Sequence, residues 1–327
     1  MKAIICTQYG PPDALQFQEV AKPAPTADEV LVKIHAASVN MYDWHLLTAD
    51  IPLVRLMGGG LLRPKVTIPG EDIAGRIEAV GSNVKQFRPG DDVFGDIAAY
   101  GNGGFAEYVA VPETALALKP TTLSFEEAAA VPMAALTALQ GLRDAGHIQA
   151  GQKVLINGAS GGVGTFAVQI AVAFGAAVTA VCSTRNLDLA RTLGADRVID
   201  YTQEDFTRSG QTYDLIFAAN GYHPLAAYKR ALAPQGIYVM AGGKPAQIFQ
   251  AMLLGSWLSE KGGKKLGGFT ARASQKDLLV LKELVEAGKV APVIDRRYPL
   301  RETAEALRYL GAGHARGKVV ITVEHSS

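Results

Sequence analysis

A glycine-rich turn between a short apolar run and an apolar helix is the first place where this chain could hold a reactive molecule. Gly161 would let the backbone approach a pyrophosphate, and Gly164 would let the following helix pack closely on the preceding strand. The free N–H groups at the start of that helix and its dipole also favour an anion. The turn matches the fingerprint G-x-G-x-x-G with alanine at its first glycine, and it predicts a dinucleotide site formed by Ala159, Ser160, Gly161, Gly162, Val163 and Gly164.

Two other interpretations of this turn are weaker. A glycine-rich connection without a ligand does not require the order of strand, turn and helix that residues 153–175 display. A P-loop needs Lys-Ser or Lys-Thr after its last glycine, whereas Gly164 is followed by Thr165. The dinucleotide interpretation therefore stands.

The end of the next strand, predicted at 178–182, indicates which dinucleotide binds. A site that prefers NAD usually carries Asp or Glu about 20 residues after the fingerprint, where it binds the ribose 2′-hydroxyl. Here that position holds Cys182 or Ser183, so no carboxylate at this point repels a 2′-phosphate. Ser183 and Arg185 can donate hydrogen bonds to such a phosphate, and the sequence therefore favours NADP. The alternative is that Arg185 is a solvated residue at the start of a helix.

The composition limits the classes of protein that need to be considered. A chain of 327 residues is too long for one typical core, so we expect two domains. The 32 Lys and Arg residues nearly balance the 31 Asp and Glu residues, which gives no electrostatic reason for binding nucleic acid or a membrane surface. The two cysteines are too few for a disulfide framework or a zinc cluster. Because the N-terminus lacks a secretory pattern and no apolar run approaches the length of a membrane span, we expect a soluble, cytoplasmic protein.

The elements that must position the glycine turn alternate between strands and helices. The apolar helix after the glycine turn is predicted to end at Gly175 as a left-handed cap. Ser124, followed three residues later by Glu127, predicts a capping box at the start of a helix. Beyond it, the pattern predicts a doubly wound parallel sheet with strands at 153–157, 177–181, 197–199, 215–218 and 236–240. Before residue 124, short β runs predict a partly closed barrel or sandwich with strands at 29–36, 73–80, 91–94 and 104–111.

The C-terminal segment after Gly268 lacks this alternation, and we expect it to return to the first domain. Its pattern predicts helices at 275–287 and 302–309 and extended runs at 294–298 and 318–323. The predicted domains are therefore 1–123 together with 268–327, and a nucleotide-binding domain at 124–267 between them. A cleft between two such domains is a common place for a substrate.

With these residues assembled, the chain resembles the zinc-free quinone oxidoreductase branch of the medium-chain dehydrogenase/reductase superfamily, which includes zeta-crystallin-like enzymes and plastid enone reductases. Each matching piece is weak alone, and their order along nearly the whole chain is specific. The pieces are ASVN at 37–40, PGEDIAG at 69–75, GDDVFG at 90–95, GGFAEY at 103–108, TA at 137–138 and NGASGGVG at 157–164. The resemblance implies an α/β protein with a GroES-like β-rich catalytic domain and a Rossmann domain.

The zinc members of this superfamily hold their metal with a Cys after an early strand, the His of a Gly-His-Glu triplet, and a further Cys or Asp. In this chain Asn40 stands at the Cys position, Gly-Glu-Asp at 70–72 replaces the triplet, and residues 131–139 contain neither Cys nor Asp. A catalytic zinc needs three protein ligands and an open position, so we expect NADP as cofactor and no zinc. A different metal site built from Glu71, Asp72, His35 and His45 is the lesser alternative.

The resemblance implies that Asn40 lies beside the nicotinamide ribose and the substrate, where its amide can donate a hydrogen bond. A turn residue that merely follows a strand is the alternative. The next residues could deliver a proton near neutral pH, and we regard Tyr42, Asp43 and His45 as further catalytic candidates. Structural roles are the alternatives here too, with Asp43 as a local cap and His45 as a satisfied histidine.

The resemblance also implies further contacts to the cofactor. Thr137 faces the nicotinamide from a helix, and Asn220 lies under the adenosine side, although it departs from the Val-Gly pair common in the family. The backbone approaches the nicotinamide at Gly242, Gly243, Phe269 and Thr270. Lys318 reaches a phosphate or is a solvated lysine.

Without a Lewis acid, oxidation of an alcohol is disfavoured, while reduction of an electron-poor acceptor remains feasible. The expected function is therefore NADPH-dependent hydride transfer to quinones or α,β-unsaturated carbonyl compounds, without nucleic-acid or membrane partners. The resemblance implies a homodimer, with residues 237–240 in the last predicted strand of the nucleotide-binding sheet as its candidate edge. Reduction of enoyl thioesters and a non-enzymatic NADP-binding or regulatory role are the alternatives. The apolar residues 248–258 form a core helix, a mobile flap over a hydrophobic acceptor, or a peripheral lipid contact.

Overall fold

The computed structural model describes residues 1–50, 60–221, 223–243, 250, 259 and 263–325. The chain divides into two compact units. Unit 1 comprises Met1–Met133, Ala273–Glu286 and Pro292–Ser327, and unit 2 comprises Ala134–Arg272 and Ala287–Ala291. The boundary predicted at residue 124 falls at the start of α3 (Phe125–Ala129), which this division assigns to unit 1.

Unit 2 is built on a six-stranded sheet in which every neighbouring pair of strands is parallel. Its strands are β8 (Lys153–Asn157), β9 (Ala177–Cys182), β10 (Arg197–Asp200), β11 (Tyr213–Ala218), β12 (Leu232–Met240) and β13 (Lys265–Gly268). The spatial order is β10-β9-β8-β11-β12-β13, so the direction of winding reverses between β8 and β11. The doubly wound parallel sheet predicted from the sequence is confirmed.

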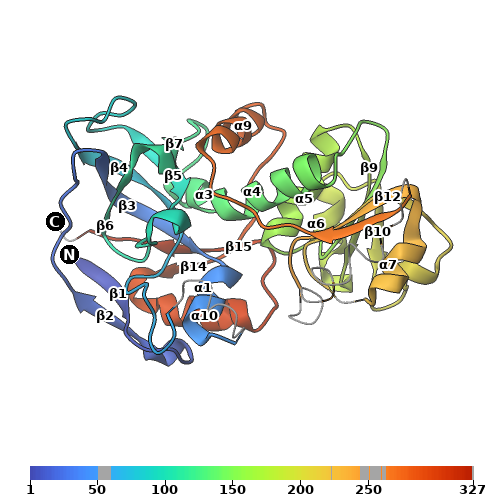
Figure 1. Cartoon of the computed structure of the whole chain (residues 1–327), viewed down its shortest axis with the longest axis horizontal. Coiled ribbons are helices and arrows are strands. Elements are labelled where there is room, and N and C mark those ends of the chain that lie inside the picture. Colours follow the sequence, from blue (N-terminus) through green and yellow to red (C-terminus); the bar gives the residue numbers. More distant parts are fainter. Residues whose placement is uncertain (51–59, 222, 244–249, 251–258, 260–262, 326–327) are drawn as a thin grey trace. The chain divides into compact units, whose positions relative to one another are not determined.

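Helices pack beside this sheet, in the part of the chain drawn from green to orange in Figure 1. They are α4 (Pro132–Gln140), which begins in unit 1, α5 (Gly162–Ala173), α6 (Leu187–Thr192) and α7 (Leu225–Ala231). Helix α5 is buried on most of its surface, as its apolar sequence predicts. It ends in a Schellman motif: Gly175 has φ of 77° and donates to Val172, and Ala176 donates to Ala171. The predicted left-handed cap at Gly175 is therefore confirmed.

The outer strand on one side of this sheet differs from our prediction. We expected residues 237–240 to form a free edge suited to pairing with a second copy of the chain. In the structure β13 pairs with β12 over Ile237–Met240, so those residues lie inside the sheet and β13 is the edge. The sequence of β13, Lys-Leu-Gly-Gly, has neither alternation nor β-branched residues, which is why it was missed.

Unit 1 is a β-rich body with a seven-stranded sheet and a separate antiparallel pair, in agreement with the predicted GroES-like class. The separate pair is β1 (Lys2–Cys6) with β2 (Leu15–Glu19). The larger sheet contains β3 (Glu29–Val39), β4 (Asp72–Val80), β5 (Asp92–Asp96), β6 (Tyr108–Pro112), β7 (Leu116–Leu118), β14 (Ile294–Pro299) and β15 (Lys318–Thr322). Its path is β14-β15-β3-β4-β5-β7, and β6 also pairs with β3.

The C-terminal segment completes unit 1, because β15 pairs with β3 in an antiparallel register. The helices of this unit are α1 (Met41–Thr48), α3, α9 (Gln275–Glu286) and α10 (Thr303–Gly311). The predicted capping box is present: the Glu127 N–H donates to Ser124 Oγ at 3.2 Å, and the Ser124 N–H donates to Glu127 Oε2 at 2.8 Å. Short 3-10 or π turns lie at Pro12–Ala14, Ala98–Tyr100, Glu113–Ala115, Gly141–Ala145, Thr184–Asn186, Phe206–Arg208 and Leu300–Glu302.

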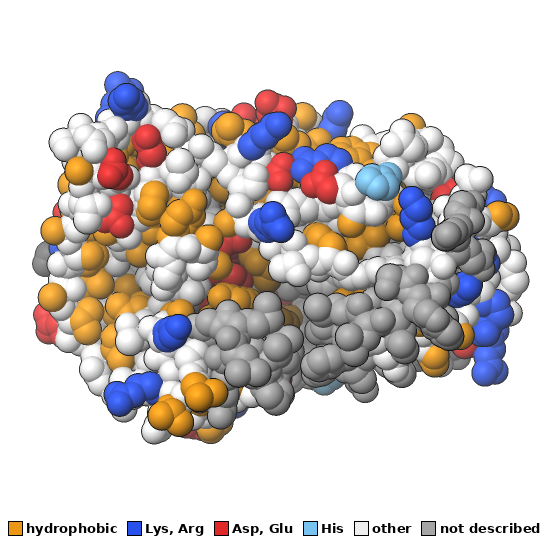
Figure 2. Space-filling model, in the orientation of Figure 1, with side chains coloured by type: hydrophobic (Ala, Val, Ile, Leu, Met, Phe, Trp, Pro, Cys, Tyr) orange, Lys and Arg blue, Asp and Glu red, His pale blue; other side chains and the backbone are white. Residues whose placement is uncertain are grey.

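Two surface properties bear on partners. In the part of the chain that the structure describes, we find no helix of sufficient length and apolarity for a membrane span. Basic and acidic side chains of the described residues are interspersed on the face drawn in Figure 2, consistent with the nearly balanced charge. The proposed flap at 248–258 lies outside the described residues, apart from Gln250.

Candidate functional site

The glycine turn of unit 2 connects β8 to α5 and begins with a left-handed residue. Gly158 has φ of 82°, a conformation that favours glycine. The N–H groups of Gly158 and Ala159 both donate to the carbonyl oxygen of Val181, at 3.1 and 3.0 Å, which fastens the turn to β9. Gly158 therefore provides the tight turn that the fingerprint assigns to its first glycine, and this explains why alanine is tolerated at position 159.

The other two fingerprint glycines are needed for different reasons. A Cβ atom on Gly164 would lie 2.0 Å from the carbonyl oxygen of Gly158, so only glycine permits this contact between helix and strand. A Cβ atom on Gly161 would meet nothing nearer than that same oxygen at 3.7 Å. The space beside Gly161 is therefore open, as an approaching pyrophosphate requires.

The remaining predicted cofactor residues of unit 2, apart from Thr137, gather at the carboxyl edge of the sheet. This edge is where ligands bind in open parallel sheets, at the point where the strand order reverses. Residues that follow the ends of β8, β9, β11, β12 and β13 are, in that order, Gly161, Ser183 with Arg185, Asn220, Gly242 with Gly243, and Phe269 with Thr270. Thr137 is buried on α4.

Asn220 lies directly against the glycine turn. Its backbone N–H donates to the carbonyl oxygen of Asn157 at 3.2 Å, and its side chain accepts from the Gly221 N–H at 2.7 Å. A Cβ atom added to Gly158 would lie 2.8 Å from the Asn220 Cβ. Although it departs from the family pattern, Asn220 is thus part of the surface that surrounds the turn.

The adenosine end of the edge contains a residue that sequence reasoning missed. Asn186 Nδ2 donates to Ser160 Oγ at 2.9 Å and to Ser183 Oγ at 3.2 Å, which ties the glycine turn to the end of β9. The Asn186 side chain is buried, and its Oδ1 has no hydrogen-bond partner among the described residues. Its partner Ser160 lies 26 positions away in the sequence, so no periodic signal indicated this contact.

A carboxylate also lies at this end of the edge, contrary to what the sequence suggested. Thr184 Oγ1 donates to Asp200 Oδ2 at 2.5 Å, and Asp200 is the last residue of β10, the neighbour of β9. Hydrogen bonds from Thr184 and Thr202 lower the pKa of Asp200, so it is ionised at neutral pH. The position after β9 holds no carboxylate, but Asp200 at the end of β10 brings one to this end of the edge, which corrects the expectation that no carboxylate here repels a 2′-phosphate.

Unit 1 holds a second polar cluster, at the adjacent ends of β15, β3 and β4. Asp72 is fully buried, and its Oδ2 accepts from Ser38 Oγ at 2.9 Å and from Asn40 Nδ2 at 2.8 Å. Lys318 Nζ lies 3.2 Å from the same Asp72 oxygen and also donates to Asn40 Oδ1. The alternative that Lys318 is solvated is wrong, because only 3% of it is exposed. The contacts of its ammonium group lie within unit 1, and they give no support to our prediction that it binds a cofactor phosphate.

Asp43 serves as a buried cap of α1. Its Oδ2 accepts from the Asn40 N–H at 2.9 Å, and its Oδ1 accepts from the Gly70 N–H at 3.1 Å. Burial raises the pKa of Asp43 to about 7, and the neighbouring charge of Asp72 adds to this effect. The structural alternative for Asp43 is thus present, together with a pKa suited to proton transfer near neutral pH.

The other two candidates on α1 have different surroundings. His45 Nδ1 lies 2.7 Å from Asp50 Oδ1, so it is the satisfied histidine considered as the alternative. Tyr42 is 39% exposed, and burial of its ring together with the charge of Glu71 raises its pKa. Tyr42 and Asp43 therefore lie beside the polar cluster, while the contacts of His45 are with Asp50.

Sequence reasoning missed the central position of Asp72 and the proximity of two further carboxyl groups, Glu71 and Asp96. Asp96 is directly opposite Asp72 in the register between β4 and β5. Burial and the charge of Asp72 raise the pKa of Asp96 to about 7. A signal was available, since polar residues interrupt the apolar strand ends at Asn40, Asp72 and Asp96.

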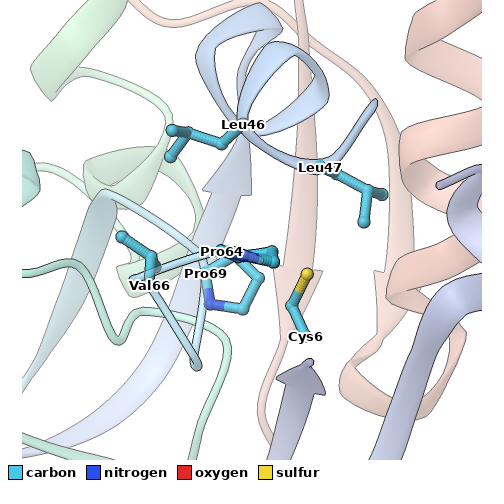
Figure 3. A pocket seen from close by; sticks show the side chains of 6 residues that line it. All are labelled: Cys6, Leu46, Leu47, Pro64, Val66 and Pro69. Carbon is cyan, nitrogen blue, oxygen red and sulfur yellow. The ribbon is translucent and has the colours of Figure 1, made fainter. Parts of the chain in front are cut away.

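A small apolar cavity in unit 1 is not a substrate site. It is lined by Cys6 from the end of β1, Leu46 and Leu47 from α1, and Pro64, Val66 and Pro69 (Figure 3). Its volume is about 10 Å³, which holds at most one water molecule.

The comparisons with known proteins agree with this architecture. A family model described as "Alcohol dehydrogenase GroES-like domain" matches residues 26–121, and one described as "Zinc-binding dehydrogenase" matches residues 193–321. The chain is 37% identical to a 2-methylene-furan-3-one reductase of Solanum lycopersicum, covering 98% of this chain and 79% of that one. It is 33% identical to an NADPH-dependent alkenal/one oxidoreductase of Arabidopsis thaliana, with the same coverage. The solved quinone oxidoreductase of Coxiella burnetii has a TM-score of 0.87 at 29% identity, covering 99% of both chains.

The second family description implies zinc, and the residues of unit 1 do not fit that metal. Both polar atoms of the Asn40 side chain are engaged, one by Asp72 and one by Lys318. The buried ammonium of Lys318 beside Asp72 would repel a divalent cation at that carboxylate. His35 stacks on Phe125 with ring centroids 4.4 Å apart, and His45 bonds to Asp50, so neither joins Glu71 and Asp72 in the alternative metal site. Fold, motif and relatives together establish that the chain belongs to the medium-chain dehydrogenase/reductase superfamily, in its quinone oxidoreductase branch.

Proposed function

We propose that this protein is an NADPH-dependent reductase of quinones or α,β-unsaturated carbonyl compounds that works without zinc. The observation that carries the proposal is the Asn40–Asp72–Lys318 network, which contains a buried ammonium in place of a set of metal ligands. Without a Lewis acid, the acceptor must already be electron-poor. The names of the relatives, a 2-methylene-furan-3-one reductase, an alkenal/one oxidoreductase and a quinone oxidoreductase, support this class of acceptor.

The residues of unit 2 would bind and orient the cofactor. The open space at Gly161 and the first N–H groups of α5 would hold its pyrophosphate, and the loops after β11, β12 and β13 would surround the rest. When bound, NADPH supplies a hydride from C4 of its nicotinamide.

Asn40 would stabilise the charge that develops on the acceptor oxygen. Its amide nitrogen carries two hydrogens, and the structure gives one of them to Asp72. The second hydrogen is available to a substrate oxygen. Because Lys318 and Asp72 hold the amide at both ends, this donor is fixed before the reaction begins, which is the condition under which such a hydrogen bond lowers a barrier most.

Turnover tests the proposal directly. NADPH oxidation is followed with quinones, enones, alkenals and enoyl-CoA thioesters, each with and without a metal chelator. We expect turnover of quinones or enones that the chelator leaves unchanged. Loss of activity with chelator would overturn the zinc-free mechanism, turnover confined to the thioesters would assign the other enzymatic class, and no turnover would favour a binding role.

The preference for NADPH over NADH is part of the proposal and has its own test. Ser183 and Arg185 favour the 2′-phosphate, whereas the ionised Asp200 opposes it. We expect Arg185→Ala to weaken NADPH binding about 10-fold or more and to leave NADH binding nearly unchanged, because a charge-assisted hydrogen bond contributes about 1.5–3 kcal/mol. Arg191→Ala, which removes an exposed arginine bonded to Asp188, is the matched control and should change neither affinity. Equal losses for both cofactors in Arg185→Ala would refute the role of Arg185.

We also propose that the protein is cytoplasmic and forms a homodimer. Among the described residues no strand pairs with the outer side of β13, along which a second copy could extend the sheet. Light scattering of the purified protein measures whether a dimer forms, and a monomer at micromolar concentration would contradict it.

A further inference from the structure

Glu71 is a buried carboxyl group to which the mechanism above assigns no task. Only 2% of the residue is exposed, and its Oε1 has no hydrogen-bond partner among the described residues. The backbone of Glu71 is fixed, since its carbonyl oxygen accepts from the Ile97 N–H at 2.8 Å. Ionisation would leave this buried oxygen neither solvated nor paired, which is strongly unfavourable.

The groups that face Glu71 make ionisation harder still. They come from four elements: Tyr42 and Asp43 on α1, Asp72 on β4, Asp96 on β5 and Lys318 on β15. These neighbours include three carboxyl groups and one cation. The cation lies 3.2 Å from Asp72, so its charge is mainly neutralised there.

Hydrogen bonds show which carboxyl groups are arranged to carry negative charge. Asp72 accepts from Ser38, Asn40 and the Met133 N–H, the last at 2.8 Å. Asp43 accepts two backbone N–H groups, and Asp96 Oδ1 accepts the Ala98 N–H at 3.0 Å. Such donors stabilise an anion, and the buried Oε1 of Glu71 has none in the described structure. Burial first, and then the charges of Asp43, Asp96 and Asp72, raise the pKa of Glu71 well above its ordinary value.

A second unpartnered oxygen near Tyr42 indicates that the place is prepared for a ligand. Asn102 is 5% exposed, and its Oδ1 lacks a hydrogen-bond partner in the described chain. Its backbone is held in the left-handed region, with φ of 63°, and its N–H donates to the carbonyl oxygen of Ile97 at 3.3 Å. The Asn102 side chain interacts with the Tyr42 hydroxyl, and burial together with the charge of Glu71 raises the pKa of Tyr42. Ile97 thus connects the backbones of the two residues that have free acceptor oxygens.

We propose that Glu71 is the proton donor of the reductase, holding a proton as a neutral acid and giving it to the reduced acceptor. This inference rests on the proposed function. The acceptor gains a hydride at its β-carbon, the nicotinamide is oxidised, and an electron pair shifts to the carbonyl oxygen. The O–H bond of Glu71 then breaks, its proton bonds to the α-carbon, and the carboxylate that remains recovers a proton from solvent. For a quinone the proton goes to the ring oxygen instead.

Glu71→Gln tests this assignment, because the amide keeps the shape of the side chain and cannot release a proton in the same way. Glu78→Gln is the matched control, since Glu78 lies on the same strand, is exposed, and pairs with Lys22. General acid catalysis contributes about 10²–10⁴-fold, so kcat for an enone should fall at least about 100-fold in Glu71→Gln. The KM for NADPH should not change. In the native protein kcat should decrease as pH rises through the pKa of Glu71, and this decrease should vanish in the variant.

A spectroscopic measurement keeps the test independent of turnover. Infrared spectra at neutral pH should contain the C=O stretch of a protonated carboxylic acid that Glu71→Gln removes and Glu78→Gln retains. If the band is unchanged in Glu71→Gln, Glu71 is ionised and the proposal is wrong. If the band disappears while kcat and its pH profile stay as in the native protein, Glu71 holds a proton but does not donate it. If the native protein turns over no acceptor, the proposed function fails, and the donor role fails with it whatever the band shows.

Discussion

The close contact between Gly164 and the glycine turn gives a sharp prediction for a single added methyl group. In Gly164→Ala the new Cβ would lie 2.0 Å from the carbonyl oxygen of Gly158 and 2.8 Å from two backbone atoms of Ala159. Ordinary C···O contacts are about 3.3–3.6 Å, so the overlap with the oxygen exceeds about 1 Å. The overlapping atoms belong to the backbone and cannot rotate away, so α5 must shift from β8.

The free energy of unfolding should therefore fall. Overpacking in a tight contact costs about 1–3 kcal/mol, and the greater helix propensity of alanine returns up to about 1 kcal/mol. These ranges allow a net loss of up to about 3 kcal/mol, and because the overlap is with backbone atoms we expect a loss of about 1–3 kcal/mol in denaturant unfolding, together with weaker NADPH binding because the turn is displaced. Stability equal to that of the native protein would refute the packing role of Gly164.

Gly161→Ala separates binding from folding in the same turn. Its Cβ would have no neighbour nearer than 3.7 Å, and the φ of −82° at Gly161 is accessible to alanine. Stability should therefore stay the same, while the dissociation constant for NADPH, measured by fluorescence titration, should rise about 10-fold or more because the methyl group occupies the space of the pyrophosphate. Gly267→Ala on β13 is the control, since its Cβ would meet nothing within 4 Å. Native affinity in Gly161→Ala would contradict a pyrophosphate at this turn.

Two further predictions concern the polar cluster of unit 1. Lys318→Met should lower the free energy of unfolding by about 3–5 kcal/mol, because it leaves the buried Asp72 carboxylate without its cation. The double variant with Asp72→Asn should recover most of the lost free energy in denaturant unfolding. No recovery would mean that the lost packing of the lysine stem causes the destabilisation. The pKa of Asp43 and that of Asp96 are raised from 3.8 to about 7, so the folded state binds their protons more tightly than the unfolded state, and the stabilisation is complete at low pH and is lost as pH rises through about 7. The midpoint temperature of thermal unfolding should thus decrease as the pH rises from about 4 to about 7, and Asp96→Asn should make this decrease shallower. An unchanged slope would show that Asp96 does not contribute.

The elements of unit 2 could be predicted closely because their signals are local. Strand β8 was placed at its observed bounds, since a parallel strand buried on both faces is a continuous apolar run bounded by polar residues. The capping box at Ser124 and the glycine cap at Gly175 also depend on neighbours within a few residues. Strand β13 could not be found in this way, because its pairing with β12 determines its conformation more than its own sequence does.

The polar cluster of unit 1 was predicted only in part, because its contacts are distant in sequence. Asn40 was recognised as a site residue, but its partner Lys318 lies 278 positions away, and Lys318 and Asp72 are 246 positions apart. No periodicity relates such positions. They meet because β15, β3 and β4 are neighbours in one sheet, a fact that only the pairing of strands reveals.

The contacts of Asn40 with Lys318 and Asp72 determine the chemistry available to its side chain. A lysine ammonium can only donate hydrogen bonds, so the amide atom that faces Lys318 must be Oδ1, and an ionised carboxylate can only accept, so the atom that faces Asp72 must be Nδ2. The orientation of the amide therefore follows from its neighbours and does not rest on an arbitrary choice between oxygen and nitrogen. Aspartate at position 40 would face Asp72 as a second carboxylate and would have no hydrogen to offer an acceptor oxygen. The network thus requires an amide at this position and engages one of its two N–H groups with Asp72, and the proposed reduction assigns the other to the acceptor oxygen.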